Sequence, residues 1–196
     1  MLSKQTSLIS GETNMTVRQL IIATTCLLIA SSGLAAESGL PFGDTNACMQ
    51  GPLQQFGRYI GDWNIEDEQL SRDTGQWEPG AGARWIFTCL GKGTAIQDFW
   101  LPASGNVGTN LRTYDAETGK WDIAWTADLS PGISRIQASQ DSDGNIVMSY
   151  VSPVPTPLRR IIFYPPSDNS WNWQLEYSND DGETWFAVYK IHATPH

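Results

Sequence analysis

Hydrophobic and polar residues alternate along most of the chain after Ile60, and short clusters of Gly, Asn, Asp and Ser interrupt the alternation at even intervals. A period of two residues is typical of β-strands with one buried and one solvated face. The pattern predicts ten strands, at residues 61–67, 83–91, 94–102, 109–115, 120–128, 132–139, 145–152, 157–165, 170–178 and 184–193. Short turns and no helical stretch between them indicate consecutive hairpins, and so an all-β, antiparallel up-and-down meander.

A flat meander of this length would leave two long edges without hydrogen-bond partners. Closure into a barrel removes both edges, so we expect a closed barrel of about ten strands. Large side chains recur on one side of several strands, for example Trp121, Ile123 and Trp125, or Trp171 and Trp173. This bulk indicates side chains that line an interior.

The segment before the first strand has a different pattern. Leu53, Phe56 and Ile60 recur at helical spacing, which predicts a short amphipathic helix over 47–59 that caps the barrel. Residues 37–46 are expected to be a flexible lead-in, and 47–196 to form one domain.

The first 36 residues are typical of a secretory signal peptide. Arg18 precedes the apolar run "LIIATTCLLIA", and small residues follow it up to Ala36. The run is shorter than the roughly 20 residues of a membrane helix, so a transmembrane anchor is the less favoured alternative. We take Met15 as the true start and expect the mature protein to be periplasmic or secreted, without a stable membrane anchor after cleavage.

The sequence "SNDDGETW", from Ser178 to Trp185, fits the Asp-box pattern Ser-x-Asp-x-Gly-x-Thr-Trp known from carbohydrate-active proteins. A propeller with several such boxes would need blades of roughly 40–50 residues each. The predicted strands are too few for that. We therefore interpret the motif as a hairpin turn and not as a site of sugar chemistry.

Charge and cysteine content narrow the functional classes. Without residues 1–36 the chain carries 10 basic and 20 acidic groups, and this negative balance excludes a nucleic-acid groove. Cys48 and Cys89 remain, and in an exported chain they predict one disulfide worth about 4 kcal/mol. The two histidines stand at the C-terminus without cysteines at metal-ligand spacing, so we expect no metal site, and we predict no cofactor.

Five motifs in order resemble a bacterial domain-of-unknown-function family of lipocalin-like, calycin-type barrels. They are "FGRYIGDWNI" from Phe56, "QDFW" from Gln97, "RTYDAETGKWDIAW" from Arg112, "RIIF" from Arg160 and "WQLEYSNDDGETW" from Trp173. Tyr59 and Ile60 stand where the family carries Phe-Trp-x-Gly. The resemblance implies a small ten-stranded barrel with an internal cavity, and it implies no particular activity.

Polar and aromatic side chains on the predicted strands are the candidates for a ligand site, because barrels of this size are filled or hold one small ligand. If Arg112 and Arg160 both pointed inward with Glu176, they could bind a carboxylate. Alternation alone leaves their direction open, since one bulge reverses the faces. The candidate ligand-binding residues are Gln97, Asp98, Trp100, Arg112, Trp125, Arg160, Trp173 and Glu176.

The pattern favours a protein that binds a small hydrophobic or amphipathic molecule in its interior. An alternative is a barrel enzyme of hydrolase or lyase type that uses Asp98, Glu176 or His192, although no known catalytic motif is present and we assign no catalytic residue. A further alternative is an interaction protein with a filled barrel and an exposed tryptophan patch.

Overall fold

The computed structural model describes residues 43–196, and it confirms the all-β fold. A short helical region precedes eleven strands. The strands are β1 (Gly61–Leu70), β2 (Trp77–Pro79), β3 (Ala83–Leu90), β4 (Ala95–Pro102), β5 (Gly108–Asp115), β6 (Lys120–Ala127), β7 (Ser130–Gln140), β8 (Ile146–Ser152), β9 (Leu158–Phe163), β10 (Trp171–Ser178) and β11 (Phe186–Pro195).

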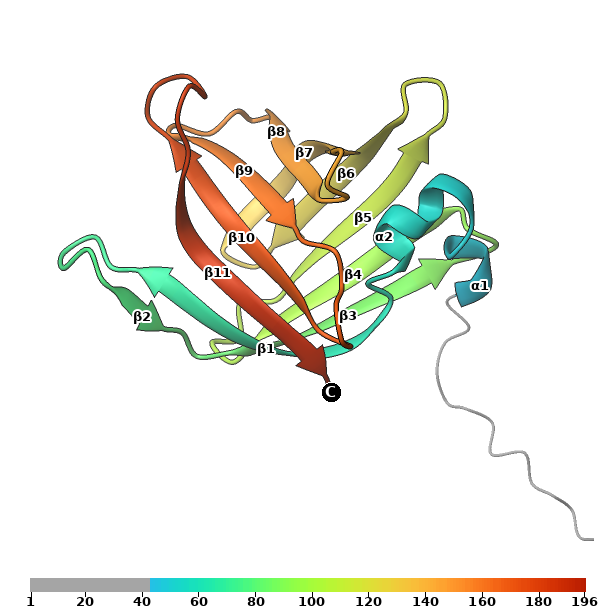
Figure 1. Cartoon of the computed structure of the whole chain (residues 1–196), viewed down its shortest axis with the longest axis horizontal. Coiled ribbons are helices and arrows are strands. Elements are labelled where there is room, and N and C mark those ends of the chain that lie inside the picture. Colours follow the sequence, from blue (N-terminus) through green and yellow to red (C-terminus); the bar gives the residue numbers. More distant parts are fainter. Residues whose placement is uncertain (1–42) are drawn as a thin grey trace, which may run out of the picture. The chain divides into compact units, whose positions relative to one another are not determined.

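Ten of these strands form a closed antiparallel barrel (Figure 1). From β3 to β11 each strand pairs with the next along the chain, and β3 pairs with β1. The last strand returns to the first, with Trp63 opposite Pro195 and Gln69 opposite Tyr189. Closure satisfies the backbone groups that a flat meander would leave unpaired, which is the physical reason for expecting a barrel.

One strand lies outside the barrel and was not predicted. After a turn at 71–76 the chain continues into β2, which folds back on the far end of β1. Three residue pairs hold it, from Glu68 opposite Pro79 to Leu70 opposite Trp77. Its three residues are too short for an alternation pattern to reveal.

The helical region is broken where a single helix over 47–59 was expected. It consists of α1 (Thr45–Cys48), a 3₁₀ turn (Gly51–Leu53) and α2 (Gln54–Gly57). Gly51 has a φ of 54°, a left-handed conformation that separates α1 from the next helical turn. Pro52 follows it and stands in the first positions of the 3₁₀ turn, where a proline is tolerated. Thr45 and Asn46, which we assigned to the lead-in, belong to α1.

The helical region closes one end of the barrel. Phe56 and Tyr59 are fully buried there, among aromatic side chains at the ends of the strands. The Phe56 ring lies 5.0 Å from the ring of Trp121 and 5.5 Å from that of Phe163, both edge to face. The Tyr59 ring lies 5.1 Å from that of Trp171. Each such contact adds about 0.5–1.5 kcal/mol beyond area burial.

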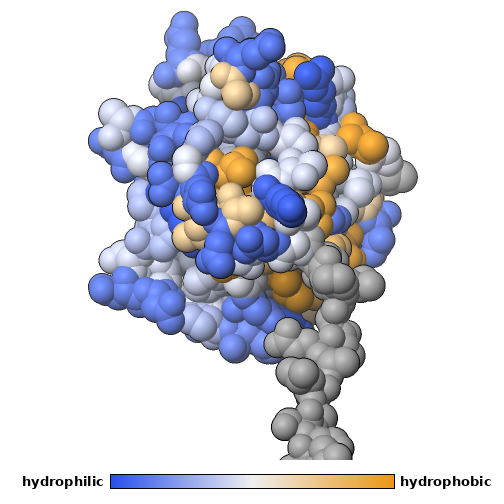
Figure 2. Space-filling view, turned by 90° about the vertical axis from the view of Figure 1, so that its right-hand side faces the viewer, coloured by the Kyte–Doolittle hydropathy of each residue, from blue (hydrophilic) through white to orange (hydrophobic). Residues whose placement is uncertain are grey.

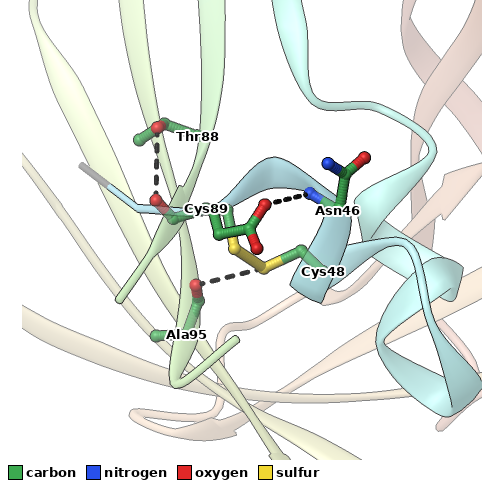
Figure 3. Close-up of a disulfide and its surroundings, with 6 residues drawn as sticks. Asn46, Cys48, Thr88, Cys89 and Ala95 are labelled. Atoms are coloured by element: carbon green, nitrogen blue, oxygen red, sulfur yellow. Dashed lines mark hydrogen bonds between the residues drawn. A yellow bond between two sulfur atoms is a disulfide. The ribbon is translucent and has the colours of Figure 1, made fainter. Parts of the chain in front are cut away.

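A disulfide between Cys48 and Cys89 ties this region to the wall, as the sequence predicts (Figure 3). It joins α1 to β3 across 41 residues, with a Cα–Cα distance of 5.9 Å, and both cysteines are buried. Gly43 pairs with Gly91 next to it. The N-terminal segment is therefore fixed to the wall at two adjacent points.

The predicted signal peptide at 1–36 and most of the predicted lead-in lie outside the described residues. Within residues 43–196, no helix is long and apolar enough to cross a membrane. Seen from the side that carries α1 and α2, the surface is mostly hydrophilic, with apolar side chains in separate groups (Figure 2).

The Asp-box forms the turn between β10 and β11. The Asp180 carboxylate accepts hydrogen bonds from the Ser178 hydroxyl (2.7 Å) and from the backbone N–H of Thr184 (2.9 Å). The Gly182 N–H donates to Ser178 Oγ at 2.9 Å, and the Trp185 indole donates to the Gly182 carbonyl at 3.0 Å. Every defining position of the pattern is used inside the turn, so the motif is structural here.

These hydrogen bonds predict a pH-dependent contribution of the turn to stability. They lower the pKa of Asp180 from its usual value to about 2, with the Thr184 hydroxyl contributing most. A depressed pKa stabilises the fold above the unfolded pKa near 4, and the effect disappears as the pH falls through 2. Thermal unfolding of Asp180→Asn should show a lower Tm at neutral pH and a difference from wild type that shrinks between pH 4 and pH 2.

The control is Asp181→Asn, which removes the same charge from the next residue. Asp181 has a φ of 57°, a conformation that Asn tolerates, and no hydrogen bond within the turn depends on its side chain. A loss in Asp181→Asn equal to that in Asp180→Asn, or a pH-independent loss in Asp180→Asn, would contradict the assignment.

Candidate functional site

The barrel contains a cavity of about 290 Å³ between the closed end and the opposite end, which we call the mouth. The mouth is formed by the connections at 71–82, 103–107, 128–129, 153–157 and 179–185. The cavity wall comes from side chains of β3 to β11 that alternate inward: Trp85, Trp100, Asn110, Arg112, Trp125, Ile136, Met148, Tyr150, Ile161, Phe163, Trp173, Leu175, Tyr189 and Ile191. The volume is at the low end of the roughly 300–1,000 Å³ of ligand pockets.

Four tryptophans give the cavity an aromatic wall. Trp85 lies at its centre, with its ring 5.1 Å from that of Trp100 and 6.2 Å from that of Trp173, both edge to face. Trp173 in turn contacts the Tyr189 ring at 5.8 Å. Edge-to-face contacts hold the rings of Trp85, Trp100 and Trp173 in fixed orientations, so these rings present flat faces to a ligand at a low cost in side-chain entropy.

A buried ion pair forms the polar part of the cavity wall. Arg112 Nη2 lies 2.5 Å from Asp98 Oδ2, and both side chains are completely inaccessible to solvent. Asn110 supports the carboxylate by donating from its side-chain amide to both oxygens at 3.1 Å and from its backbone N–H at 3.0 Å. The strand alternation of β4 and β5 places all three side chains on the inner face.

The Arg112 guanidinium also contacts the aromatic cluster of the closed end. Its central carbon lies 4.8 Å from the centre of the Phe56 ring and 5.3 Å from that of Phe87. Its nitrogens, including Nε and Nη1, form no hydrogen bond of good geometry with any residue of 43–196. Ring faces compensate part of the charge, and the remaining N–H donors leave capacity for an acceptor on a ligand.

Two buried indole N–H groups of the cavity wall also lack a hydrogen-bond acceptor. Nε1 of Trp85 and Nε1 of Trp173 are buried and have no acceptor among the described residues. Buried polar groups in proteins are nearly always hydrogen-bonded, and an unpaired one costs about 1–3 kcal/mol. The unpaired buried groups on the cavity residues are all donors, which suits a ligand that carries acceptors.

Two tyrosines mark the boundary between the cavity and the mouth. The Tyr189 hydroxyl donates a hydrogen bond to Asp67, and burial together with this carboxylate raises the pKa of Tyr189. Burial also raises the pKa of Tyr150. Both phenols therefore stay protonated at neutral pH, and because Tyr189 already donates to Asp67, only the Tyr150 hydroxyl can donate to a ligand.

The predicted site residues divide into two groups. Trp100, Arg112, Trp125 and Trp173 line the cavity, and Asp98 lies behind Arg112 as its ion partner. The other three candidates are Gln97, Arg160 and Glu176. These lie on the outer face, because each alternates with neighbours that point into the barrel.

The outer candidates form structural contacts. Arg160 pairs with Glu176, which also accepts a hydrogen bond from Gln174, and the Arg160 guanidinium lies 4.4 Å from the ring centre of Trp185. The Gln97 amide donates to the Thr109 hydroxyl. Trp185 of the Asp-box thus covers an ion pair on the outer wall, and these residues do not contact a molecule in the cavity.

The residues of the enzyme alternative do not meet. Asp98 is inside the barrel, whereas Glu176 and the exposed His192 are on its outer face. His192 forms a hydrogen bond with Asn172 at 2.9 Å. All nine tryptophans of the chain are buried or half-buried, so the described surface carries no exposed tryptophan patch either.

Sequence reasoning missed several cavity residues. Asn110 stands two positions before Arg112 and Trp85 two before Phe87, so strand alternation could have placed both on the inner face. Tyr150 and Tyr189 lie next to bulges in β8 and β11, where the alternation is interrupted. For these two residues the sequence offers no comparable signal.

The comparisons with known proteins bear on the fold alone. No family model matches the sequence, and no curated protein matches it. The structure is similar to the S-type phycobiliprotein lyase CpeS from Guillardia theta, with a TM-score of 0.51 and 10% identity over 78% of this chain and 96% of that chain. It is also similar to Rv2717c from M. tuberculosis, with a TM-score of 0.47 and 11% identity over 75% of this chain and 98% of that chain.

At such low identity, a similarity in structure indicates a common architecture and says nothing about a shared ligand or reaction. The architecture seen here and the likeness to the lyase agree with the barrel that the sequence motifs predict. The chain has a calycin-like antiparallel β-barrel fold.

Proposed function

We propose that the chain is an exported protein that binds one small, mostly apolar molecule inside its barrel. The observation that carries this proposal is the cavity of about 290 Å³, with its four tryptophans and its buried donors without acceptors.

The mouth supports the same proposal. Eight large apolar residues of the described chain are exposed, and six of them lie at or next to the mouth: Val107, Leu129, Ile133, Val151, Val154 and Phe186. An apolar rim lowers the cost of removing an apolar ligand from water as it enters.

Export and family membership are parts of the proposal. The signal peptide at 1–36 directs the chain to the periplasm or to the outside, where the Cys48–Cys89 disulfide is stable. The five motifs that resemble the bacterial domain-of-unknown-function family suggest membership in it. N-terminal sequencing of the protein from its own host would locate the cleavage site.

Binding of a neutral fluorescent probe tests the proposal. N-phenyl-1-naphthylamine has an apolar body of suitable size and becomes fluorescent in an apolar site. We expect the wild type to bind it with a stoichiometry of one. Leu175→Trp should reduce the affinity by about tenfold or more without loss of stability, because Leu175 lines the cavity next to the mouth and the larger ring would fill it.

The matched control is Leu111→Trp, the same exchange at a residue on the outer face of β5 that is 41% exposed. It should leave probe binding unchanged. Native mass spectrometry of the protein from its own host should in addition show one bound molecule. Absence of probe binding in the wild type, or equal binding by both variants, would refute the proposal.

A further inference from the structure

Arg159 lies at the mouth and differs from the other buried or half-buried arginines of the described chain. Arg112 and Arg160 each pair with a carboxylate, and Arg58 donates to the Gly144 carbonyl. The side chain of Arg159 forms neither an ion pair nor a hydrogen bond with any residue of 43–196, and its Nε is buried. Water can satisfy the outer nitrogens, whereas a buried donor without a partner costs free energy.

The strand alternation directs Arg159 inward. It stands two positions before Ile161, which lines the cavity, and it is opposite Tyr177 of β10. Its guanidinium carbon lies 5.2 Å from the centre of the Tyr177 ring. The guanidinium is therefore held against Tyr177, which lines the groove outside the cavity.

Tyr150 of the cavity wall is a neighbour of Arg159 across the pair of β8 and β9, because Ser149 lies opposite Arg160. The Arg159 charge lowers the pKa of Tyr150 against a larger rise caused by burial. Neither the Tyr150 nor the Tyr177 hydroxyl has a hydrogen-bond partner within the described residues. One unpaired cation and two free hydroxyls thus lie together at the mouth.

No acidic residue lines the groove outside the cavity, so nothing in its lining would repel an anion. It has a volume of about 680 Å³, and it shares Leu175 and Tyr189 with the cavity and includes Tyr177. Arg72 also lines it, and none of its lining residues is acidic, although the chain has 21 acidic and 12 basic groups. The groove on the other side of β1 is lined by Glu66, Asp67 and Glu68.

We propose that the ligand is an amphipathic organic acid whose anionic group binds Arg159, Tyr150 and Tyr177 at the mouth while its apolar body fills the cavity. This inference rests on the proposed function and adds the chemical class and the orientation of the ligand. A guanidinium with adjacent hydroxyl donors recognises a carboxylate or sulfonate. Arg112 is a poorer anchor for such a group, because Asp98 already balances its charge and would repel a second anion.

Two probes with the same apolar body test the proposal. 8-Anilinonaphthalene-1-sulfonate carries an anionic group that N-phenyl-1-naphthylamine lacks. We expect the wild type to bind the sulfonate more tightly by about tenfold or more, as a charge-assisted hydrogen bond would provide. Arg159→Gln should remove this preference and keep the affinity for the neutral probe, which also reports that the variant is folded. Arg159→Lys should retain part of it.

The charge-matched control is Arg135→Gln, which removes an arginine from the outer wall where it pairs with Asp122. This variant should keep the preference for the sulfonate. A preference that persists in Arg159→Gln, or equal binding of both probes by the wild type, would overturn the inference and leave the proposed function standing. Failure of the wild type to bind either probe would overturn both.

Discussion

Arg112→Met is expected to lower the free energy of unfolding by about 3–5 kcal/mol, the largest effect of any single substitution proposed for this chain. The substitution leaves the Asp98 carboxylate in a site that solvent does not reach, with Asn110 as its remaining polar support. The same change removes the cation from the rings of Phe56 and Phe87. Urea unfolding followed by tryptophan fluorescence measures the loss.

The double variant Asp98→Asn with Arg112→Met should be considerably more stable than Arg112→Met alone. Without either charge the cavity wall no longer contains an uncompensated ion, and the new side-chain amide at position 98 would still accept from the Asn110 N–H. The control is Arg84→Met, which breaks a pair with Asp62 whose side chains are 44% and 36% exposed, and it should cost far less than Arg112→Met because solvent screens the pair. Equal costs for Arg112→Met and Arg84→Met, or additive losses in the double variant, would contradict this account.

Replacement of both disulfide cysteines, as Cys48→Ala with Cys89→Ala, is expected to cost about 2–5 kcal/mol. The bond closes a loop of 41 residues, for which the chain-entropy model gives about 4 kcal/mol. It also fixes α1 against β3, so the helical region that covers the closed end loses its covalent attachment. Thermal unfolding of the variant should show a lower Tm than that of the oxidised wild type.

Reduction of the wild type provides the control, since it breaks the same bond without changing any residue. The reduced wild type and the double alanine variant should unfold at similar temperatures. Binding of the neutral probe should be weakened little in the folded variant, because neither cysteine lines the cavity. A variant as stable as the oxidised wild type would show that the helical region is held by its aromatic contacts alone.

The sequence predicted the strands because their hydrophobic alternation is a local property. Nine of the ten expected strands match a barrel strand to within about two residues at each end. Such a difference is no larger than the uncertainty in where a strand begins or ends. The first strand, expected at 61–67, continues to Leu70, and it is followed by β2. The short span of β2 leaves too few residues for a periodic signal.

Which face of a strand points inward was decided by the tertiary structure. Arg112 and Arg160 occupy similar strand patterns, yet one is fully buried in the barrel and the other lies on the outer wall beneath Trp185. Bulges that add one residue to β8 and one to β11 reverse the alternation along these strands, and a sequence does not display them. The candidate site was therefore only partly predictable.

By itself the sequence determined an all-β meander, the disulfide partners and the structural role of the Asp-box. Strand periodicity and turn chemistry depend on residues that are neighbours along the chain, and the disulfide follows from the number of cysteines. Only the tertiary structure decided that β11 pairs with β1, that Asp98 meets Arg112 inside the wall, and that Arg159 stands unpaired at the mouth. These depend on closure and register, which are set by contacts between residues far apart along the chain.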